Sequence, residues 1–135
     1  MATIQKELIT KATPEQVWAA LRDVGALHTR LVPGFVVDTR METGARLVTF
    51  GNGMVVRERI VTVDDALRRV VWSATGETLS HHNGAAQVFP YGDGGSKLIW
   101  TSDLLPDEAA AAMGSMMEQG VAAMQVALTK LAADQ

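Results

Sequence analysis

The stretch that decides the fold is residues 107–133, DEAAAAMGSMMEQGVAAMQVALTKLAA. Its large apolar residues recur at helical spacing, and a run of strands ends just before it, at Leu104-Leu105-Pro106. This pattern predicts one long helix beginning near Asp107. Methionine adapts to irregular gaps and to apolar guests, so the stripe indicates a lid over an interior space. The stripe consists of Met113, Met116, Met117, Met124, Leu128 and Leu131.

Upstream of this helix, turn signals divide the chain into short segments. Thr13-Pro14-Glu15-Gln16 predicts a helix start, because Thr13 can act as the N-cap and Gln16 completes a capping box. Gly51-Asn52-Gly53 predicts a tight hairpin. The order is strand, two short helices, six strands and the long helix, which predicts an α+β fold. In it, a curved antiparallel sheet of about seven strands wraps around the long helix. The predicted strands are 4–10, 35–41, 45–50, 54–63, 67–75, 79–91 and 97–105.

The bulk properties exclude several classes of protein. The chain has 135 residues, 47% of them hydrophobic and 20% charged, which predicts a single domain covering residues 1–135. A net charge of −3 argues against a positively charged surface that would bind nucleic acid. There is no cysteine, and the adjacent pair His81-His82 points to opposite faces of a strand, so we expect no metal and no cofactor. The polar start and the lack of a long apolar run predict no membrane span and a cytoplasmic location.

With these segments in place, the chain resembles the START-like (SRPBCC) superfamily, whose members share the helix-grip fold. Within it the chain is most similar to the bacterial polyketide cyclase/dehydrase and lipid-transport family. The resemblance implies an internal cavity between the sheet and the C-terminal helix. It covers nearly the whole chain and is carried by ATPEQVW at 12–18, LVPG at 31–34, RERI at 57–60, DD at 64–65, RRVVWS at 68–73 and GDGGSKLIW at 92–100.

The abscisic acid receptors of the same superfamily imply particular pocket positions. Their strand glutamate matches Glu58, their pocket phenylalanine matches Trp72, and their pocket tyrosine falls near His82. The gating loop and the latch motif of those receptors are absent from this sequence. The resemblance therefore implies a pocket without implying a hormone receptor.

Strand alternation gives an independent view of Glu58. Met54, Val56, Glu58 and Ile60 share one face of a strand, and this mostly apolar face is the expected inner one. A carboxylate there must be paired, hydrogen-bonded or hydrated. Glu58 is therefore a candidate ligand anchor or general base, and the alternative is a structural ion pair.

The other candidate site residues follow from the same alternation. His82 shares a face with Gly84, Ala86 and Val88, and the small residues Gly84, Ala85 and Ala86 would leave open volume beside it. On the last strand the alternation leaves two choices open: either Trp100 or Asp103 points inward. In the second case Asp103 would be a cavity carboxylate near Glu58.

Three functions remain open at this stage. The first is binding or transport of a small hydrophobic molecule, such as a lipid, an aromatic compound or a polyketide-like compound. The second is a cofactor-independent cyclase or dehydratase that uses Glu58 with His82 or Asp103 as acid and base. The third is a regulatory module that forms a homodimer. The expected ligand-binding residues are Trp72, Met54, Val56, Gly84, Ala86, Met113, Met117, Val121 and Met124.

Overall fold

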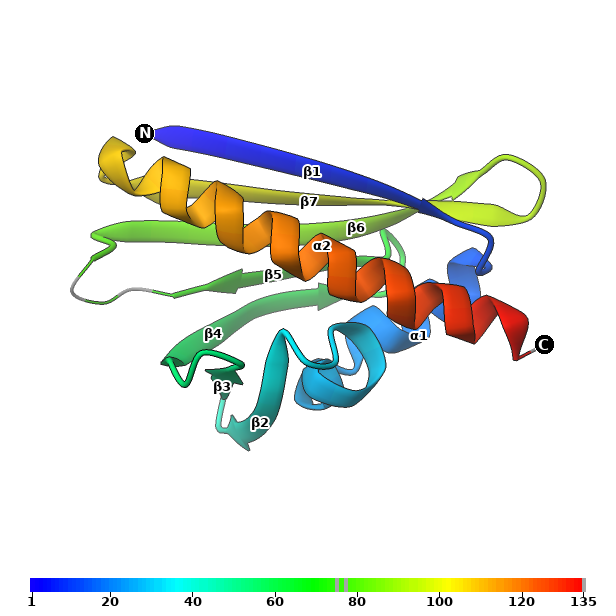
Figure 1. Ribbon diagram of the computed structural model, residues 1–135, viewed down its shortest axis with the longest axis horizontal. Coiled ribbons are helices and arrows are strands. Elements are labelled where there is room, and N and C mark those ends of the chain that lie inside the picture. Colours follow the sequence, from blue (N-terminus) through cyan, green and yellow to red (C-terminus); the bar gives the residue numbers. More distant parts are fainter. Residues whose placement is uncertain (75, 77, 135) are drawn as a thin grey trace.

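A computed structural model describes residues 1–74, 76 and 78–134 of the chain (Figure 1). Seven antiparallel strands form one sheet in the order β1-β7-β6-β5-β4-β3-β2. From β2 to β7, each strand pairs with the strand that follows it in the sequence, and β1 pairs with β7 at one edge of the sheet. The strands are β1 (Ala2–Thr10), β2 (Val36–Glu42), β3 (Ala45–Phe50), β4 (Val55–Asp64), β5 (Arg69–Ser73), β6 (His81–Tyr91) and β7 (Gly95–Leu105).

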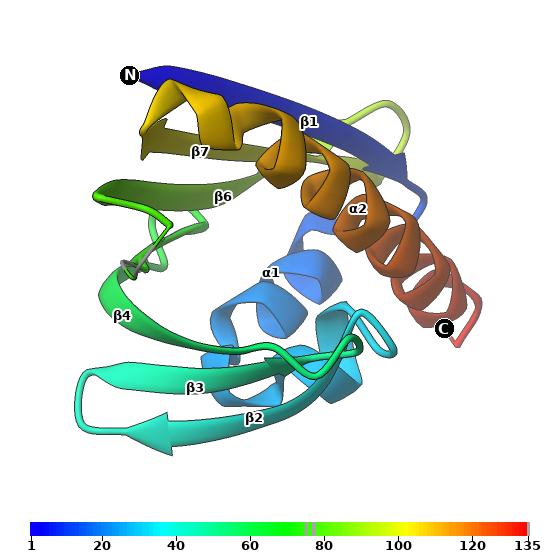
Figure 2. The same cartoon turned by 60° about the vertical axis from the view of Figure 1, so that its left-hand side comes forward.

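Helices connect the two edges of the sheet and cover its concave side. The segment between β1 and β2 contains α1 (Pro14–Arg22), a 3-10 turn η1 (Val24–Ala26) and a π-helical turn η2 (Leu27–Leu31). After β7, a 3-10 turn η3 (Asp107–Ala109) leads into α2 (Ala110–Ala133). Figure 2 shows α2 lying across the concave side of the sheet, with α1 closer to its C-terminal half.

Local sequence signals account for the boundaries of these elements. The hydroxyl of Thr13 accepts a hydrogen bond from the backbone N–H of Gln16, and the Gln16 side chain accepts one from the Thr13 N–H. This reciprocal capping satisfies two donors that a helix start otherwise leaves free. In the β3–β4 hairpin Gly53 has a φ of 89°, a conformation that side chains with a Cβ rarely adopt.

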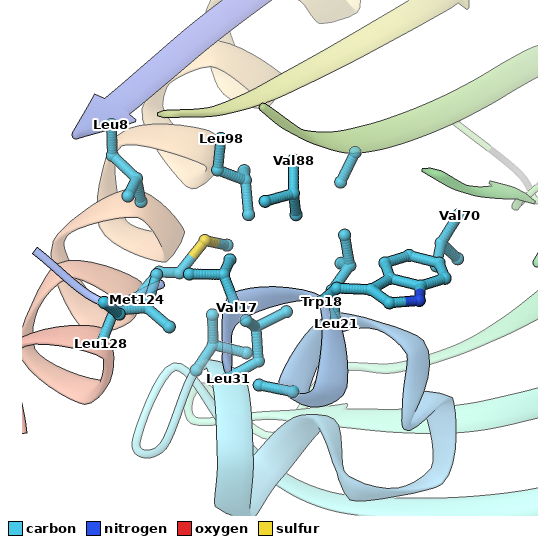
Figure 3. Close-up of a cluster of buried hydrophobic side chains, with 14 of the residues drawn as sticks. Leu8, Val17, Trp18, Leu21, Leu31, Val70, Val88, Leu98, Met124 and Leu128 are labelled. Atoms are coloured by element: carbon cyan, nitrogen blue, oxygen red, sulfur yellow. The ribbon is translucent and has the colours of Figure 1, made fainter. Parts of the chain in front are cut away.

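The packed core lies between α1, the C-terminal half of α2 and the sheet (Figure 3). Met124 and Leu128 of α2 are almost fully buried in it. The side-chain amide of Gln16 also donates to the backbone carbonyl of Leu131, which ties α1 to the last turns of α2. Further members of this core are Leu8, Val17, Trp18, Leu21, Leu31, Val70, Val88 and Leu98.

The predicted helix-grip fold is confirmed: an open, curved seven-stranded sheet, short helices after the first strand and a long C-terminal helix. The predicted strands match the observed ones within a few residues at each end. Thr75 and Glu77, which the sequence placed in a strand end and a turn, lie outside the described residues, as does Gln135. Among the helices of the described ranges, none is long and apolar enough to cross a membrane.

Candidate functional site

A cavity of about 180 Å³ lies between the sheet and the N-terminal half of α2. Side chains from α1, η2, α2 and strands β2 to β7 line it, so segments far apart in the sequence meet there. The wall is mostly apolar. Its methionines are Met54, Met113, Met116, Met117 and Met124, and its other large residues include Leu27, Leu31, Phe35, Phe50, Val56, Trp72 and Trp100.

Helix α2 can approach the sheet closely because of one glycine. A Cβ at Gly120 would lie 2.8 Å from Cζ3 of Trp100 and 3.2 Å from Cε2 of Phe35. The first distance is shorter than a Cβ contact allows and the second is tighter than most, so the two aromatic rings occupy the space that a side chain would need. Gly120 therefore packs directly against these two rings. Gly114, one or two turns earlier, has no neighbour within 4 Å of such a Cβ.

Aromatic rings form the sheet side of the cavity. The rings of Trp72 and Trp100 have their centroids 6.4 Å apart and are inclined at 48°. Phe35 and Phe50 meet edge to face with centroids 5.3 Å apart. The edge-to-face contact is favourable for aromatic quadrupoles, and both pairs have centroid distances in the usual range for aromatic pairs.

Glu58 points inward, as alternation predicted, and it forms a buried ion pair. Nε of Arg46 donates to Oε1 of Glu58 at 2.8 Å, and the two residues are 4% and 8% exposed. Arg46 also donates from Nη1 to the backbone carbonyl of Val24 at 3.1 Å, and its guanidinium lies 5.6 Å from the ring centroid of Trp72. The pair is thus neutral as a unit and is held by hydrogen bonds on two sides.

Sequence reasoning overlooked Arg46, although a signal was present. A hairpin centred on Asn52 places residues whose numbers sum to 104 opposite one another, and this pairs Arg46 with Glu58. Opposite charges at facing positions of one sheet surface are expected to interact. The hairpin register therefore identifies the partner of the buried carboxylate.

His82 also points into the cavity and has a defined tautomer. Its Nδ1 accepts a hydrogen bond from the backbone N–H of Ala74 at 3.1 Å. Because that donor is obligatory, the neutral ring carries its proton on Nε2. The pKa of His82 lies below its usual value of 6.5, first because burial disfavours the charged ring and second because His81 is adjacent, while Asp103 opposes the shift.

Two further polar groups belong to the same wall. Ser102 of β7 is 1% exposed and faces the cavity. Nε1 of Trp100 is buried and, among the described residues, has no hydrogen-bond partner. A buried donor without an acceptor is rare in folded proteins, so this edge of the cavity is short of acceptors.

The structure corrects three placements made from the sequence. Trp100 and Ser102 face inward, so Asp103 lies on the outer surface of the sheet, where it accepts a hydrogen bond from Thr3. Gly84 leaves no open volume, since a Cβ there would lie 2.5 Å from Cε2 of Trp72, whose indole fills the space. Val121 packs against the core and is not part of the cavity wall.

The remaining candidates do line the cavity, and their role in binding stays a prediction. The inward group comprises Met54, Val56, Glu58, Trp72, His82, Ala86, Met113, Met117 and Met124. Among the described residues, no three His, Asp or Glu side chains are grouped to hold a metal ion. The homodimer hypothesis also stays a prediction.

Fold and cavity together define an α+β protein of the helix-grip class. A sequence profile of the family described as "Polyketide cyclase / dehydrase and lipid transport" matches residues 1–134. The chain therefore belongs to this family, whose fold binds hydrophobic ligands. A comparison with curated proteins finds no match.

Solved structures from several organisms share this fold. The protein XoxI from Bacillus cereus superposes with a TM-score of 0.85 at 20% identity, over 95% of this chain and 96% of that one. A START superfamily protein from Mycobacterium smegmatis gives 0.76 at 12% identity, with 96% and 98% covered. Norcoclaurine synthase from Thalictrum flavum, in complex with dopamine and hydroxybenzaldehyde, gives 0.73 at 20% identity, with 99% and 87% covered. At these identities the likeness concerns the fold alone.

Proposed function

We propose that the protein binds a small hydrophobic molecule in the cavity between the sheet and the N-terminal half of α2. The observation that carries this proposal is the cavity of about 180 Å³ itself, walled by methionine and aromatic side chains. An apolar cavity of roughly 150 Å³ is large enough to bind benzene. Most of the wall is apolar, so burial of the ligand's apolar surface supplies most of the affinity.

The size of the cavity favours a compact ligand over a long lipid chain. Pockets that enclose drug-sized molecules have volumes of roughly 300–1,000 Å³. The cavity here is smaller and matches a molecule of one or two rings. The norcoclaurine synthase complex supports this choice, since its two ligands are single-ring aromatic compounds.

A titration with a neutral aromatic probe tests the proposal. Toluene should quench or shift the tryptophan fluorescence saturably, because Trp72 and Trp100 line the cavity. The variant Ala86→Leu fills space inside the cavity and should abolish the response. Its matched control is Ala85→Leu, the next residue of β6, which lies on the outer face and should leave the response unchanged.

Either of two results would reject the proposal. The first is the absence of a saturable response in the wild-type protein. The second is an equal response in the Ala86→Leu variant, which would place the probe elsewhere. Mass spectrometry of compounds that co-purify from the native host would then identify the natural ligand if the proposal holds.

A second candidate function is cofactor-independent acid–base catalysis. The observation that favours it is that two ionisable side chains, Glu58 and His82, line one cavity. His82 would donate a hydrogen bond from its Nε2–H to the substrate, and the Glu58 carboxylate would accept a proton after its ion pair with Arg46 separates. Asp103 has no part in this scheme because it lies outside. A substrate screen with Glu58→Gln as the inactive control tests it, and turnover retained in that variant would reject it.

A further inference from the structure

The polar groups on the β6–β7 side of the cavity are mainly donors. His82 presents Nε2–H, since its other ring nitrogen is occupied by the Ala74 N–H. In the described part of the chain, neither this N–H nor the Ser102 hydroxyl makes a side-chain hydrogen bond. The only carboxylate in the described wall, that of Glu58, already accepts from Arg46. The cavity therefore offers a free N–H donor at His82, beside a hydroxyl at Ser102 that can donate or accept.

The strand register brings two of these donors to the same place. On β6 and β7, His82 faces Leu104 and Gly84 faces Ser102, so His82 and Ser102 are diagonal neighbours on the inner face. Diagonal positions are separated by roughly 7–8 Å at Cα and less at Cβ. The two side chains therefore border the same part of the cavity wall.

The charges of the wall select against ionic ligands. Among the described lining residues only Arg46 and Glu58 carry charge, and they neutralise one another at 2.8 Å. A carboxylate or ammonium ligand would lose its hydration and find no free counter-charge. An uncharged ligand avoids this cost.

We propose that the cavity takes an uncharged molecule of about one ring that carries an accepting carbonyl oxygen, held by Nε2–H of His82 with the Ser102 hydroxyl beside it. The ligand class is thus an aryl ketone, aldehyde or ester. This inference rests on the proposed binding function and adds its polar anchor. The lowered pKa of His82 supports it, because a neutral ring keeps the donor on Nε2.

Three probes of similar size test this ligand class. Acetophenone has the ring and the carbonyl, ethylbenzene has the ring alone, and benzoate carries a negative charge. Because one neutral hydrogen bond is worth a factor of about 3 to 10 in affinity, acetophenone should bind more tightly than ethylbenzene by that factor. Benzoate should bind at least about tenfold more weakly than acetophenone. Tryptophan fluorescence or calorimetric titration gives the three dissociation constants.

A variant of His82 assigns the preference to one atom. In His82→Asn the side-chain oxygen can still accept from the Ala74 N–H, but the Nε2–H donor is gone. The ratio of the acetophenone and ethylbenzene affinities should fall to within about twofold of unity. Taking the ratio cancels the change in cavity volume, which affects both probes. The control His81→Asn alters the neighbouring residue, which is only half-buried, and should keep the wild-type ratio.

The outcomes separate this inference from the proposed function. Equal binding of acetophenone and ethylbenzene, or tighter binding of benzoate, would overturn the inference and leave the binding function intact. No binding of any probe would overturn both. If His82→Asn does not fold, nitrogen-15 spectra of the wild-type imidazole decide the question. A proton found on Nδ1 would overturn the inference, and a proton on Nε2 whose signal shifts with acetophenone alone would support it.

Discussion

The two halves of α2 face different interiors. In the C-terminal half, Leu128 is fully buried in the core, and Met124 belongs both to the core and to the end of the cavity wall. In the N-terminal half, Met113 and Met116 are half-buried and face the cavity. Helix α1 lies closer to the last turns of α2 and is tied to them through Gln16 (Figures 1 and 2), while its Leu21 borders the cavity. One amphipathic helix therefore serves as core at one end and as cavity wall at the other.

The ion pair at the cavity end gives the largest expected effect. Glu58→Gln leaves the buried Arg46 charge without its partner, so the free energy of unfolding should fall by about 3–5 kcal/mol. Glu42→Gln removes an exposed pair with Arg57 on the same sheet and should cost less than about 1 kcal/mol. Urea denaturation of both variants measures the difference. Similar losses in the two would show that the pair at Glu58 is hydrated and the cavity open to water.

Truncation of the helix itself compares the two ends directly. Leu128→Ala removes a fully buried side chain from close-packed core and should cost about 2–5 kcal/mol. Met116→Ala removes a half-exposed side chain that already borders empty space, so its cost should be about 1 kcal/mol or less. The same denaturation experiment applies. An equal loss for Met116→Ala would mean that the cavity end is packed as tightly as the core.

The two glycines of α2 extend the comparison to the close approach of helix and sheet. Gly120→Ala forces its new methyl group against Trp100 and Phe35 and should cost about 1–3 kcal/mol. Gly114→Ala meets nothing within 4 Å and should stabilise the helix by about 0.5–1 kcal/mol. Melting temperatures that fall for Gly120→Ala and rise for Gly114→Ala would confirm that Trp100 limits how closely α2 approaches the sheet. Stabilisation by both substitutions would contradict it.

The sequence was a good guide wherever a local rule decides the structure. The capping residues at Thr13 and the hairpin at Asn52 placed elements correctly, and period-two alternation oriented Glu58 and His82. The sequence was insufficient where the pairing of neighbouring strands decides which side chains face the cavity. Trp100 and Asp103 could not be separated, because both faces of that strand mix polar and apolar residues.

The misplaced Gly84 illustrates the same limit. Its small size looked like open volume, yet the register sets it opposite Trp72, whose indole covers it. A glycine in a strand often marks the close approach of another group. Only the cross-strand partner distinguishes an empty space from one that a large neighbour fills.

The smallest expected effect concerns the pH dependence of stability at the cavity end. The folded protein holds the pKa of His82 below 6.5, whereas the unfolded chain protonates this residue near 6.5. As the pH falls below 6.5, the unfolded state therefore binds a proton that the folded state resists, and stability declines. Above that pH the full contribution of His82 to the stability is present.

Between about pH 7.5 and about pH 5.5 the wild-type protein should lose more stability than His82→Asn, because the variant has no ring to titrate. Urea denaturation at the two pH values gives the comparison, and His81→Asn should fall between the two, because burial still lowers the pKa of His82 when the charge of its neighbour is removed. Equal losses of stability in the wild type and in His82→Asn would mean that the ring is protonated as easily in the folded protein as in the unfolded chain. The His82 side chain would then be hydrated rather than buried in the cavity wall.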